Sequence, residues 1–218
     1  MPYETDIFET LRHRLMTNGF EHGEKVRAEH LRQEFDCSAS TIREALFRLS
    51  TLGLVQFQEQ RGFRVPEKSA RLLHELTHLR VLLEAEGTAM SIKRGGVAWE
   101  AQLTAAHHQL SHLEMRLHTS KDSEPFIDLW FAAERQFHET LISACGSDVL
   151  ITTHRQIYGR FRQQLMVEDR AFDFISGNIK HHQQILDAAM AGDEALTRAK
   201  IHDHLARHLI DGPALQPS

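Results

Sequence analysis

Cysteine is scarce in this sequence, and several features that define large classes of proteins are missing. The two cysteines are Cys37 and Cys145, and neither has a CxxC partner. They fall in different predicted domains, so we expect no structural disulfide. No hydrophobic run approaches the about 20 residues that span a bilayer, and the N-terminus lacks a signal-peptide pattern. We therefore expect a cytoplasmic protein with no membrane partner.

Excess basic charge and common enzyme motifs are missing as well. The net charge is −5, and residues 1–66 hold nine Lys and Arg against ten Asp and Glu, so charge alone does not predict nucleic-acid binding. The sequence has no HExxH motif, no nucleophile elbow and no glycine-rich phosphate loop, which disfavours an enzyme. What the chain does have is 41% hydrophobic residues over 218 positions, enough for one large domain or two modest ones.

Residues 31–52 have the pattern of two short helices joined by a tight turn. Leu31 and Phe35 are four residues apart and share a helix face. The segment from Asp36 to Ser38 interrupts the pattern, and Ser38 is a good N-cap for the second helix. Gly53 suits the left-handed position that ends this helix, whose apolar residues are Ile42, Ala45, Leu46, Leu49 and Leu52.

Two strands and an earlier helix complete the N-terminal pattern. Leu54–Phe57 and Gly62–Val65 are predicted strands, separated by a turn from Gln58 to Arg61. An amphipathic helix runs from about Ile7 to Asn18. Three helices and a hairpin over residues 4–66 predict a winged helix-turn-helix, a module that places one helix in the DNA major groove. The alternative is a small α/β unit with surface arginines, but the order of elements favours DNA binding.

The rest of the sequence predicts helices only. An apolar stripe begins after Ser69 and runs to Arg94, where two glycines break it. Further helical segments follow at about 98–118, 124–144, 147–167, 172–192 and 193–209. The predicted fold class is therefore mainly α. It comprises a winged helix-turn-helix domain over residues 1–66, an all-α bundle of about six helices over 67–211 and a disordered tail over 212–218.

Histidine is abundant in this helical region, which holds thirteen of the sixteen histidines. Three pairs are spaced i, i+4 and so share a helix face: His74 with His78, His108 with His112, and His204 with His208. Such a pair can bind a metal ion, but it is more often a surface or packing feature. Spacing alone does not choose among the pairs.

Residues 38–66 resemble the DNA-binding domain of the GntR family of bacterial transcription regulators. The family's core is matched by residues 38–46, SASTIREAL, its LxxLxxxGLV motif by residues 46–55, and its wing by Arg61, Gly62 and Val65. The resemblance implies base or phosphate contacts from Arg43, phosphate contacts from hydroxyls at the helix N-terminus, and a close approach of Gly62 to the minor groove. The predicted DNA-binding residues are Ser38, Ser40, Thr41, Arg43, Arg48, Arg61, Gly62 and Arg64. Ala39 stands where the family usually has an arginine that reads a base, which suggests a different operator preference or weaker base readout.

The helical region is similar to the FCD ligand-binding domain of the FadR-like subfamily. Its motifs are matched by Arg80 with Glu84, by ERQFH at 134–138, by His182 followed by Gly192-Asp193, and by His204-Leu205. The resemblance implies a divalent metal, Zn, Ni, Mn or Fe, bound by one carboxylate and three histidines: Glu134, His138, His182 and His204. Glu134 replaces the usual Asp, so its longer side chain changes the geometry of the site. His181 is the rival of His182, but it points about 100° away on the same helix.

The combined interpretation is a metabolite-responsive, sequence-specific transcription regulator, with repression as its expected action. By resemblance, we expect a small carboxylate or sugar acid as effector, with Arg80 as the first candidate to bind it. Arg160 and Arg162, on a later predicted helix, are weaker candidates. We expect a homodimer on a pseudo-palindromic DNA operator, because two identical readers fit two half-sites. One alternative keeps the regulator without a metal, so that the histidines and arginines bind the effector directly. A remote alternative is a metal-dependent enzyme that uses the same site.

Overall fold

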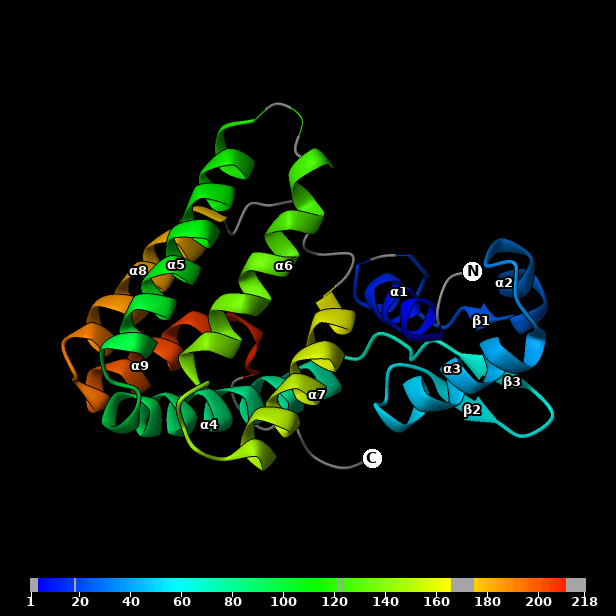
Figure 1. The fold of residues 1–218 in the computed structure, drawn as a ribbon, viewed down its shortest axis with the longest axis horizontal. Helices are drawn as coiled ribbons and strands as arrows, with labels where there is room; N and C mark the ends of the chain where they lie inside the picture. The colour runs from blue at the N-terminus through cyan, green and yellow to red at the C-terminus, as the bar shows by residue number, and fades with distance from the viewer. Residues whose placement is uncertain (1–3, 18, 121, 123, 166–174, 211–218) are drawn as a thin grey trace. The chain divides into compact units, whose positions relative to one another are not determined.

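The computed structural model describes residues 4–17, 19–120, 122, 124–165 and 175–210. By its internal contacts the chain divides into two compact units (Figure 1). Unit 1 comprises residues 1–70 and 159–167, and unit 2 comprises residues 71–158 and 168–218. The predicted tail, residues 212–218, lies outside the described residues, as does the predicted helix start near Phe172.

Unit 1 contains the three helices that the sequence predicts. They are α1 (Glu4–Met16), α2 (Ala28–Glu34) and α3 (Ala39–Thr51), and α3 packs against both of the others. The core between them is apolar and includes the fully buried Leu11, Leu15, Ile42, Leu46 and Leu49. Ser38 caps α3, since its hydroxyl accepts a hydrogen bond from the Thr41 amide, and Gly53 has a φ of 74° just after the helix. Both end signals read from the sequence are therefore confirmed.

A small antiparallel sheet completes unit 1. Strands β2 (Gln56–Gln58) and β3 (Gly62–Arg64) form the predicted hairpin, with Phe57 opposite Phe63. The first strand starts two residues later than predicted, because the backbone of Leu54 is bonded elsewhere: its amide donates to the Leu49 carbonyl and its carbonyl accepts from Gln163. A third strand, β1 (Lys25–Val26), pairs with the other side of β3. The sequence did not reveal β1, because two residues are too few for an alternation of polar and apolar positions.

The last turns of helix α7 (Asp148–Leu165) also belong to unit 1. Gln163 donates hydrogen bonds from its side-chain amide to the carbonyl oxygens of Leu15 and Leu54, at 3.2 and 2.8 Å. Gln164 accepts a hydrogen bond from the Ser69 amide at 2.8 Å. These glutamines satisfy backbone groups at the ends of unit 1 elements. The sequence had placed the whole of this helix in the second domain.

Unit 2 is a bundle of helices, as predicted. It contains α4 (Ala70–Arg94), α5 (Gly96–Thr119), α6 (Glu124–Leu141), the first part of α7, α8 (Ile175–Met190) and α9 (Glu194–Leu205), followed by a 3₁₀ turn, η2 (Ala206–His208). Helix α5 packs against α6 and α8, and α8 packs against α9 (Figure 1). The fold class read from the sequence is confirmed. Among the described residues, no helix combines the length and apolar character needed to cross a membrane.

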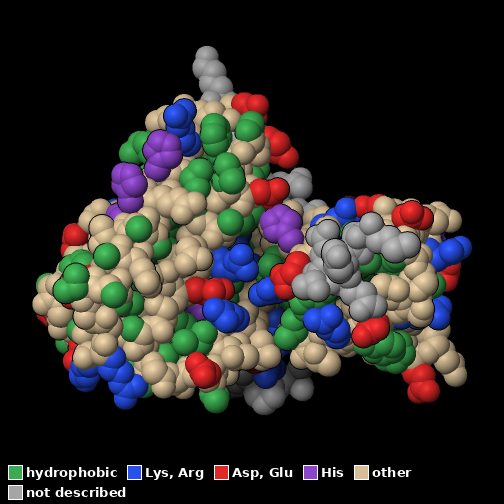
Figure 2. Space-filling view, viewed as in Figure 1, with side chains coloured by type: hydrophobic (Ala, Val, Ile, Leu, Met, Phe, Trp, Pro, Cys, Tyr) green, Lys and Arg blue, Asp and Glu red, His purple; other side chains and the backbone are tan. Residues whose placement is uncertain are grey.

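The interior of unit 2 contains an unusual number of ionisable side chains. Fully buried examples are Arg80, Glu84, Glu114, His138, His154 and His182. Buried charges require partners, because desolvation otherwise costs several kcal/mol each. On the surface, by contrast, Lys and Arg side chains are interspersed with Asp and Glu on the face displayed in Figure 2. The buried ionisable groups therefore make this interior the candidate ligand site of unit 2.

Candidate functional site

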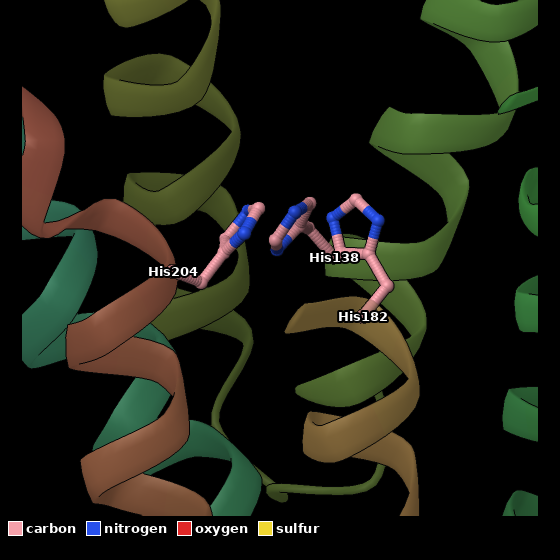
Figure 3. A group of neighbouring side chains, drawn as sticks. All are labelled: His138, His182 and His204. Atoms are coloured by element: carbon pink, nitrogen blue, oxygen red, sulfur yellow. The ribbon is translucent and has the colours of Figure 1, made fainter. Parts of the chain in front are cut away.

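Three histidines from three helices meet in the interior of unit 2. His138 comes from α6, His182 from α8 and His204 from α9, and Figure 3 shows their rings turned toward a common centre. One ring nitrogen of each lies within 4.8 Å of the other two. Among the described residues, no other group of three potential metal ligands was found at this spacing. Convergence of side chains from separate helices is how helical bundles form metal sites.

Each of the three rings has a buried nitrogen without a hydrogen bond. Among the described residues, His138 Nε2, His182 Nε2 and His204 Nδ1 form none, although Glu134 Oε1 lies 3.4 Å from His138 Nε2. Burial lowers the pKa of His138, although Glu84 opposes the shift. Burial also lowers the pKa of His204 well below its usual value, and His182 and His138 add to the effect. Neutral imidazoles with unused lone pairs are the form that binds a metal, so the donor set fits a divalent ion such as Zn²⁺.

Two buried carboxylates lie at hydrogen-bond distance from the Nδ1 atoms of two of these histidines. Glu84, on α4, accepts a hydrogen bond from His138 Nδ1 at 2.8 Å. Glu114 Oε1, on α5, lies 2.9 Å from His182 Nδ1, at hydrogen-bond distance. Burial would raise the pKa of the Glu84 carboxyl, but Arg80 and the bonds from His138 and His154 hold it well below 4.5. Glu84 is therefore an ionised acceptor at neutral pH.

Glu134, the predicted carboxylate ligand, lies beside the three histidines without joining their close group. Its Oε1 is 3.4 Å from His138 Nε2. Its other oxygen accepts a hydrogen bond from the Tyr158 hydroxyl. Glu134 is 4% exposed, so its position at the edge of the cluster is still inside the bundle. Glu134 is one helical turn before His138. Its side chain is one methylene longer than that of Asp, which lets its carboxylate reach this position beside His138 Nε2.

Arg80 is engaged with neighbours in the same interior. Its Nε donates to Glu84 Oε1 at 2.7 Å, and its guanidinium carbon lies 4.8 Å from the centre of the Tyr158 ring. His154 Nε2 bonds to the same Glu84 oxygen at 2.9 Å. Arg80, the predicted effector residue, is thus in a network with Glu84 that leads directly to His138. Arg160 and Arg162 lie instead in the last turns of α7, which cluster with unit 1.

Sequence reasoning did not predict Glu114, His154 and Tyr158 as site residues. A signal existed for Glu114, which stands between Leu110 and Leu117 at helical spacing and so interrupts an inward apolar face. No comparable signal marks His154, because isolated helical histidines are common. The remaining i, i+4 pairs stay apart from the cluster: the His74 and His78 rings are 6.5 Å apart on α4, and His108 and His112 are exposed.

The predicted DNA-binding residues lie on α3 and the hairpin of unit 1. The Ser38 hydroxyl is 2.6 Å from the Ser40 hydroxyl and 2.9 Å from that of Thr41, so the three form an exposed polar group at the helix N-terminus. Arg43 is exposed on the outer face of α3, with Glu29 as a distant ion-pair partner at 3.9 Å. A weak, solvated pair of this kind leaves the guanidinium able to exchange partners at little cost.

The other arginines in this set differ in their contacts. The Arg48 guanidinium lies over the Phe8 ring, with 4.2 Å between its carbon and the ring centre. Arg64 donates a hydrogen bond to the Gly23 carbonyl, which ties the hairpin to the β1 segment. Arg61 is exposed in the turn, and next to it Gly62 has a φ of 80°, with nothing within 4 Å of the position that a Cβ would occupy. The tip of the hairpin is therefore open to an external partner.

Comparison with known proteins supports the interpretation of unit 1 as a DNA-binding domain and of unit 2 as an FCD domain. Residues 3–65 match the family described as "Bacterial regulatory proteins, gntR family", and residues 75–207 match the family described as "FCD domain". The sequence is 27% identical to the HTH-type transcriptional repressor GlaR of Escherichia coli K12 over 92% of this chain and 91% of that protein.

A second sequence relative and a solved structure are also similar to this chain. The sequence is 37% identical to the uncharacterized HTH-type transcriptional regulator BphR of Paraburkholderia xenovorans LB400 over 64% of this chain, a segment that spans only 56% of that protein. Among solved structures, E. coli McbR/YncC has a TM-score of 0.79 with 19% identity, and the match covers 95% of both chains. At that identity the structural match speaks for the fold alone.

Proposed function

The chain belongs to the GntR family of bacterial transcription regulators with an FCD domain, and we propose that it is a metabolite-responsive repressor whose FCD unit binds a divalent metal. It is a DNA-binding transcription regulator and not an enzyme. We assign operator binding to residues 1–66, and binding of metal, effector and a second copy of the chain to residues 67–211. As a regulator of bacterial genes it would act in the cytoplasm.

One observation carries the metal proposal. His138, His182 and His204 each offer a ring nitrogen within 4.8 Å of the other two, and each ring has a buried nitrogen that forms no hydrogen bond among the described residues. An unsatisfied buried polar atom costs about 1–3 kcal/mol, and three at one point are hard to explain unless a ligand completes them. Glu134 would supply the fourth protein ligand from its position beside His138. Zn, Ni, Mn or Fe would suit this set of nitrogens and oxygen.

The effector is proposed to be a small carboxylate or sugar acid. A bound metal ion with open coordination positions would attract an anionic group. Arg80 is the proposed protein partner for that group, since it is buried next to Glu84, which hydrogen-bonds His138. An incoming carboxylate would compete with Glu84 for the Arg80 guanidinium. Arg160 and Arg162, which the sequence also suggested, are weaker candidates because they cluster with unit 1.

Operator recognition is proposed to rest on α3 and the hairpin. Arg43 would contact bases or phosphates, and Ser38, Ser40 and Thr41 would bind a phosphate at the N-terminus of α3. Arg61, Gly62 and Arg64 would bring the hairpin to the minor groove, and Arg48 would add positive charge. A homodimer would place two such units on two half-sites of a pseudo-palindrome.

The experiment that tests this function measures operator affinity while candidate effectors are titrated. A selected DNA duplex is followed by fluorescence anisotropy with the full chain, and a panel of small carboxylates and sugar acids is added to zinc-loaded and to chelator-treated protein. We expect at least one ligand that binds the FCD unit to change the operator Kd by about 5- to 150-fold, the usual range of coupling between sites. If every ligand that binds unit 2 leaves the operator Kd unchanged, the protein is not a sensor of this kind.

The DNA-reading surface is tested separately with Arg43→Ala and, as a matched control, Arg71→Ala. Arg71 is an exposed arginine on α4 that pairs with Glu75. We expect Arg43→Ala to weaken operator binding at least tenfold, which corresponds to about 1.4 kcal/mol. An Arg43→Ala variant with wild-type affinity would contradict the assignment of α3 as the reading helix.

A further inference from the structure

Two buried glutamates stand behind the histidine cluster, on helices that contribute none of the three histidines. Glu84 lies on α4 and Glu114 on α5, and both are fully buried. Each lies at hydrogen-bond distance from the Nδ1 of one histidine, whose Nε2 is buried and forms no hydrogen bond among the described residues. We propose that Glu84 and Glu114 are positioning residues for the metal, and that each fixes one ligand ring in the orientation and tautomer that present Nε2 to the ion. This inference rests on the metal binding proposed above.

The tautomer follows from the chemistry of the hydrogen bonds. A neutral imidazole carries one N–H donor and one acceptor nitrogen, whereas an ionised carboxylate only accepts. His138 Nδ1 is 2.8 Å from Glu84 Oε2, and His182 Nδ1 is 2.9 Å from Glu114 Oε1. Against the ionised Glu84 the proton lies on Nδ1 of His138, and the proposal assigns the same tautomer to His182, which leaves the Nε2 lone pair free in both rings. Carboxylate–histidine–metal chains of this form orient the ring and increase the basicity of the ligand nitrogen.

The charge of Glu114 gives a second argument. Glu84 has Arg80 as a cationic partner at 2.7 Å. For Glu114, the second carboxylate oxygen is buried and has no hydrogen-bond partner among the described residues. A buried carboxylate with one hydrogen bond is costly to ionise unless a cation is near, and an interaction with the buried His107 is the other contact recorded for Glu114. A divalent ion held by His182 would supply a positive charge one imidazole away from Glu114. The same ion would also bind the ring nitrogens that form no hydrogen bond.

The two glutamates also differ as experimental targets. Replacement of Glu84 would leave the buried Arg80 without its carboxylate and would disturb the fold. Among the described residues Glu114 forms no ion pair with Lys or Arg, so Glu114→Gln keeps the shape and a hydrogen-bond acceptor without stranding a buried guanidinium. Glu100→Gln is the matched control, because Glu100 is an exposed glutamate on the same helix.

The test measures zinc affinity of the untagged full chain by competition with a chromophoric chelator. We expect Glu114→Gln to fold and to bind zinc about 10- to 100-fold more weakly than the wild type, whereas Glu100→Gln binds it equally well. Wild-type affinity in Glu114→Gln would overturn the inference while leaving the proposed metal site intact. No zinc binding by the wild type would instead overturn the proposed function.

A spectroscopic readout separates positioning from simple packing. In metal-free protein, long-range ¹⁵N–¹H spectra of the imidazoles distinguish the two tautomers. We expect the Nδ1–H tautomer for His182 in the wild type and a shift toward the Nε2–H tautomer in Glu114→Leu, which cannot accept a hydrogen bond. An Nε2–H tautomer for His182 in the wild type would contradict the inference.

A separate observation concerns the reading surface of unit 1. Phe47 on α3 and Phe57 on β2 are 45% and 49% exposed, although their ring centres are only 4.9 Å apart. Both rings also contact the buried Phe63, which anchors them to the hairpin. Phe47 is one helical turn beyond Arg43, on the side of α3 away from the core residues Ile42 and Leu49. The result is an apolar patch on the same face as an exposed arginine.

We infer that Phe47 reads thymine in the operator through the 5-methyl group of the base. The major groove exposes that methyl group, and apolar side chains contact it in protein–DNA complexes. The charge around the patch suits a duplex, because Arg43 and Arg61 are exposed on α3 and on the hairpin turn. DNA matches this combination of an apolar patch and arginines, because its major groove displays thymine methyl groups between two rows of phosphates. The inference deepens the proposed function, since it names a base that α3 reads.

The test replaces single dT residues with dU, which removes only the methyl group. Duplexes are first selected from a random library with the full chain, and each dT is then replaced in turn. We expect one replacement per half-site to weaken wild-type binding about fourfold, the effect of one methyl group removed from an apolar contact. Phe47→Ala should bind the dT and dU duplexes equally. If no dU duplex is bound more weakly, or if Phe47→Ala discriminates as well as the wild type, the inference is wrong; failure to select any sequence would count against the proposed reader itself.

Discussion

At the scale of single residues, unit 2 can bury ionisable side chains where each is paired with a neighbour of complementary charge or hydrogen-bonding capacity. Arg80, Glu84 and His138 are all fully buried, and each is a partner of the next. The resemblance to known regulators predicted His138, His182 and His204, and the structure brings these three together. It could not predict Glu114 or Tyr158 as partners, because a contact between helices depends on helix rotation and packing, which spacing along one helix does not specify.

Replacement of Glu84 by Gln tests the buried ion pair. The variant leaves Arg80 in an apolar interior without its carboxylate, and we expect a loss of about 3–5 kcal/mol in the free energy of unfolding. Urea denaturation of the full chain measures the loss. Glu86→Gln is the control on the same helix, because Glu86 is 58% exposed and pairs with Arg198 at the surface, and it should cost less than about 1 kcal/mol. Equal losses in the two variants would contradict the role of Glu84.

The stability of metal-free protein should depend on pH through the buried histidines. The pKa values of His138 and His204 lie below 6.5 in the folded chain, with burial as the main cause. Between 6.5 and those lowered values the unfolded chain binds more protons, so acid favours unfolding. We expect the free energy of unfolding to fall as the pH drops from about 7.5 to about 5.5, by up to about 1.4 kcal/mol per pKa unit of depression for each histidine.

Denaturant titrations at several pH values in the presence of a chelator measure this dependence. His204→Gln removes one of the two groups and should show a shallower slope than the wild type. A slope that stays unchanged in His204→Gln would show that the titration of other groups controls the stability.

At the scale of elements, the sequence predicted most of the helices because their signals are local. Ser38 at the start of α3 and Gly53 at its end are chemical markers that act through adjacent backbone. The helices of unit 2 follow from apolar periodicity in the same way. The sheet was harder to predict, since β1 is defined by its pairing with β3, about forty residues away in the chain. Leu54 continues the apolar pattern of the strand, yet its backbone amide and carbonyl are bonded to Leu49 and Gln163 outside the ladder.

The hairpin offers a prediction that separates folding from DNA binding. Gly53 and Gly62 both have positive φ, but a Cβ at Gly53 would lie 2.9 Å from Arg160 Nε, while a Cβ at Gly62 would meet nothing. Each Gly→Ala change should cost about 1–2 kcal/mol of stability through backbone strain, with the larger loss at Gly53. Under conditions where both variants are folded, we expect only Gly62→Ala to weaken operator binding. Denaturation curves and fluorescence anisotropy measure the two effects, and an unaffected operator Kd in Gly62→Ala would exclude a close approach of the hairpin to DNA.

At the scale of the whole molecule, one chain combines a DNA reader with a candidate sensor. The family match assigns the two halves, and the chemistry of each half agrees with its assignment. Unit 1 presents arginines and hydroxyls on α3 and the hairpin, whereas unit 2 encloses a cluster of ionisable groups that includes Arg80, Glu84 and His138. Sequence motifs identified both halves because those motifs are local and dense. The identity of the effector did not follow from them, since specificity depends on the shape of a buried interior to which several helices contribute.

Metal retention is the measurement that tests the central claim most directly. The untagged full chain is loaded with zinc, passed through a desalting column and analysed for metal, together with His182→Ala and His181→Ala. The adjacent His181 is the control, because its ring is not one of the three that converge. We predict about one zinc per chain in the wild type and in His181→Ala, and almost none in His182→Ala. Loss of zinc from both variants alike, or its absence from the wild type, would contradict a metal centre at His138, His182 and His204.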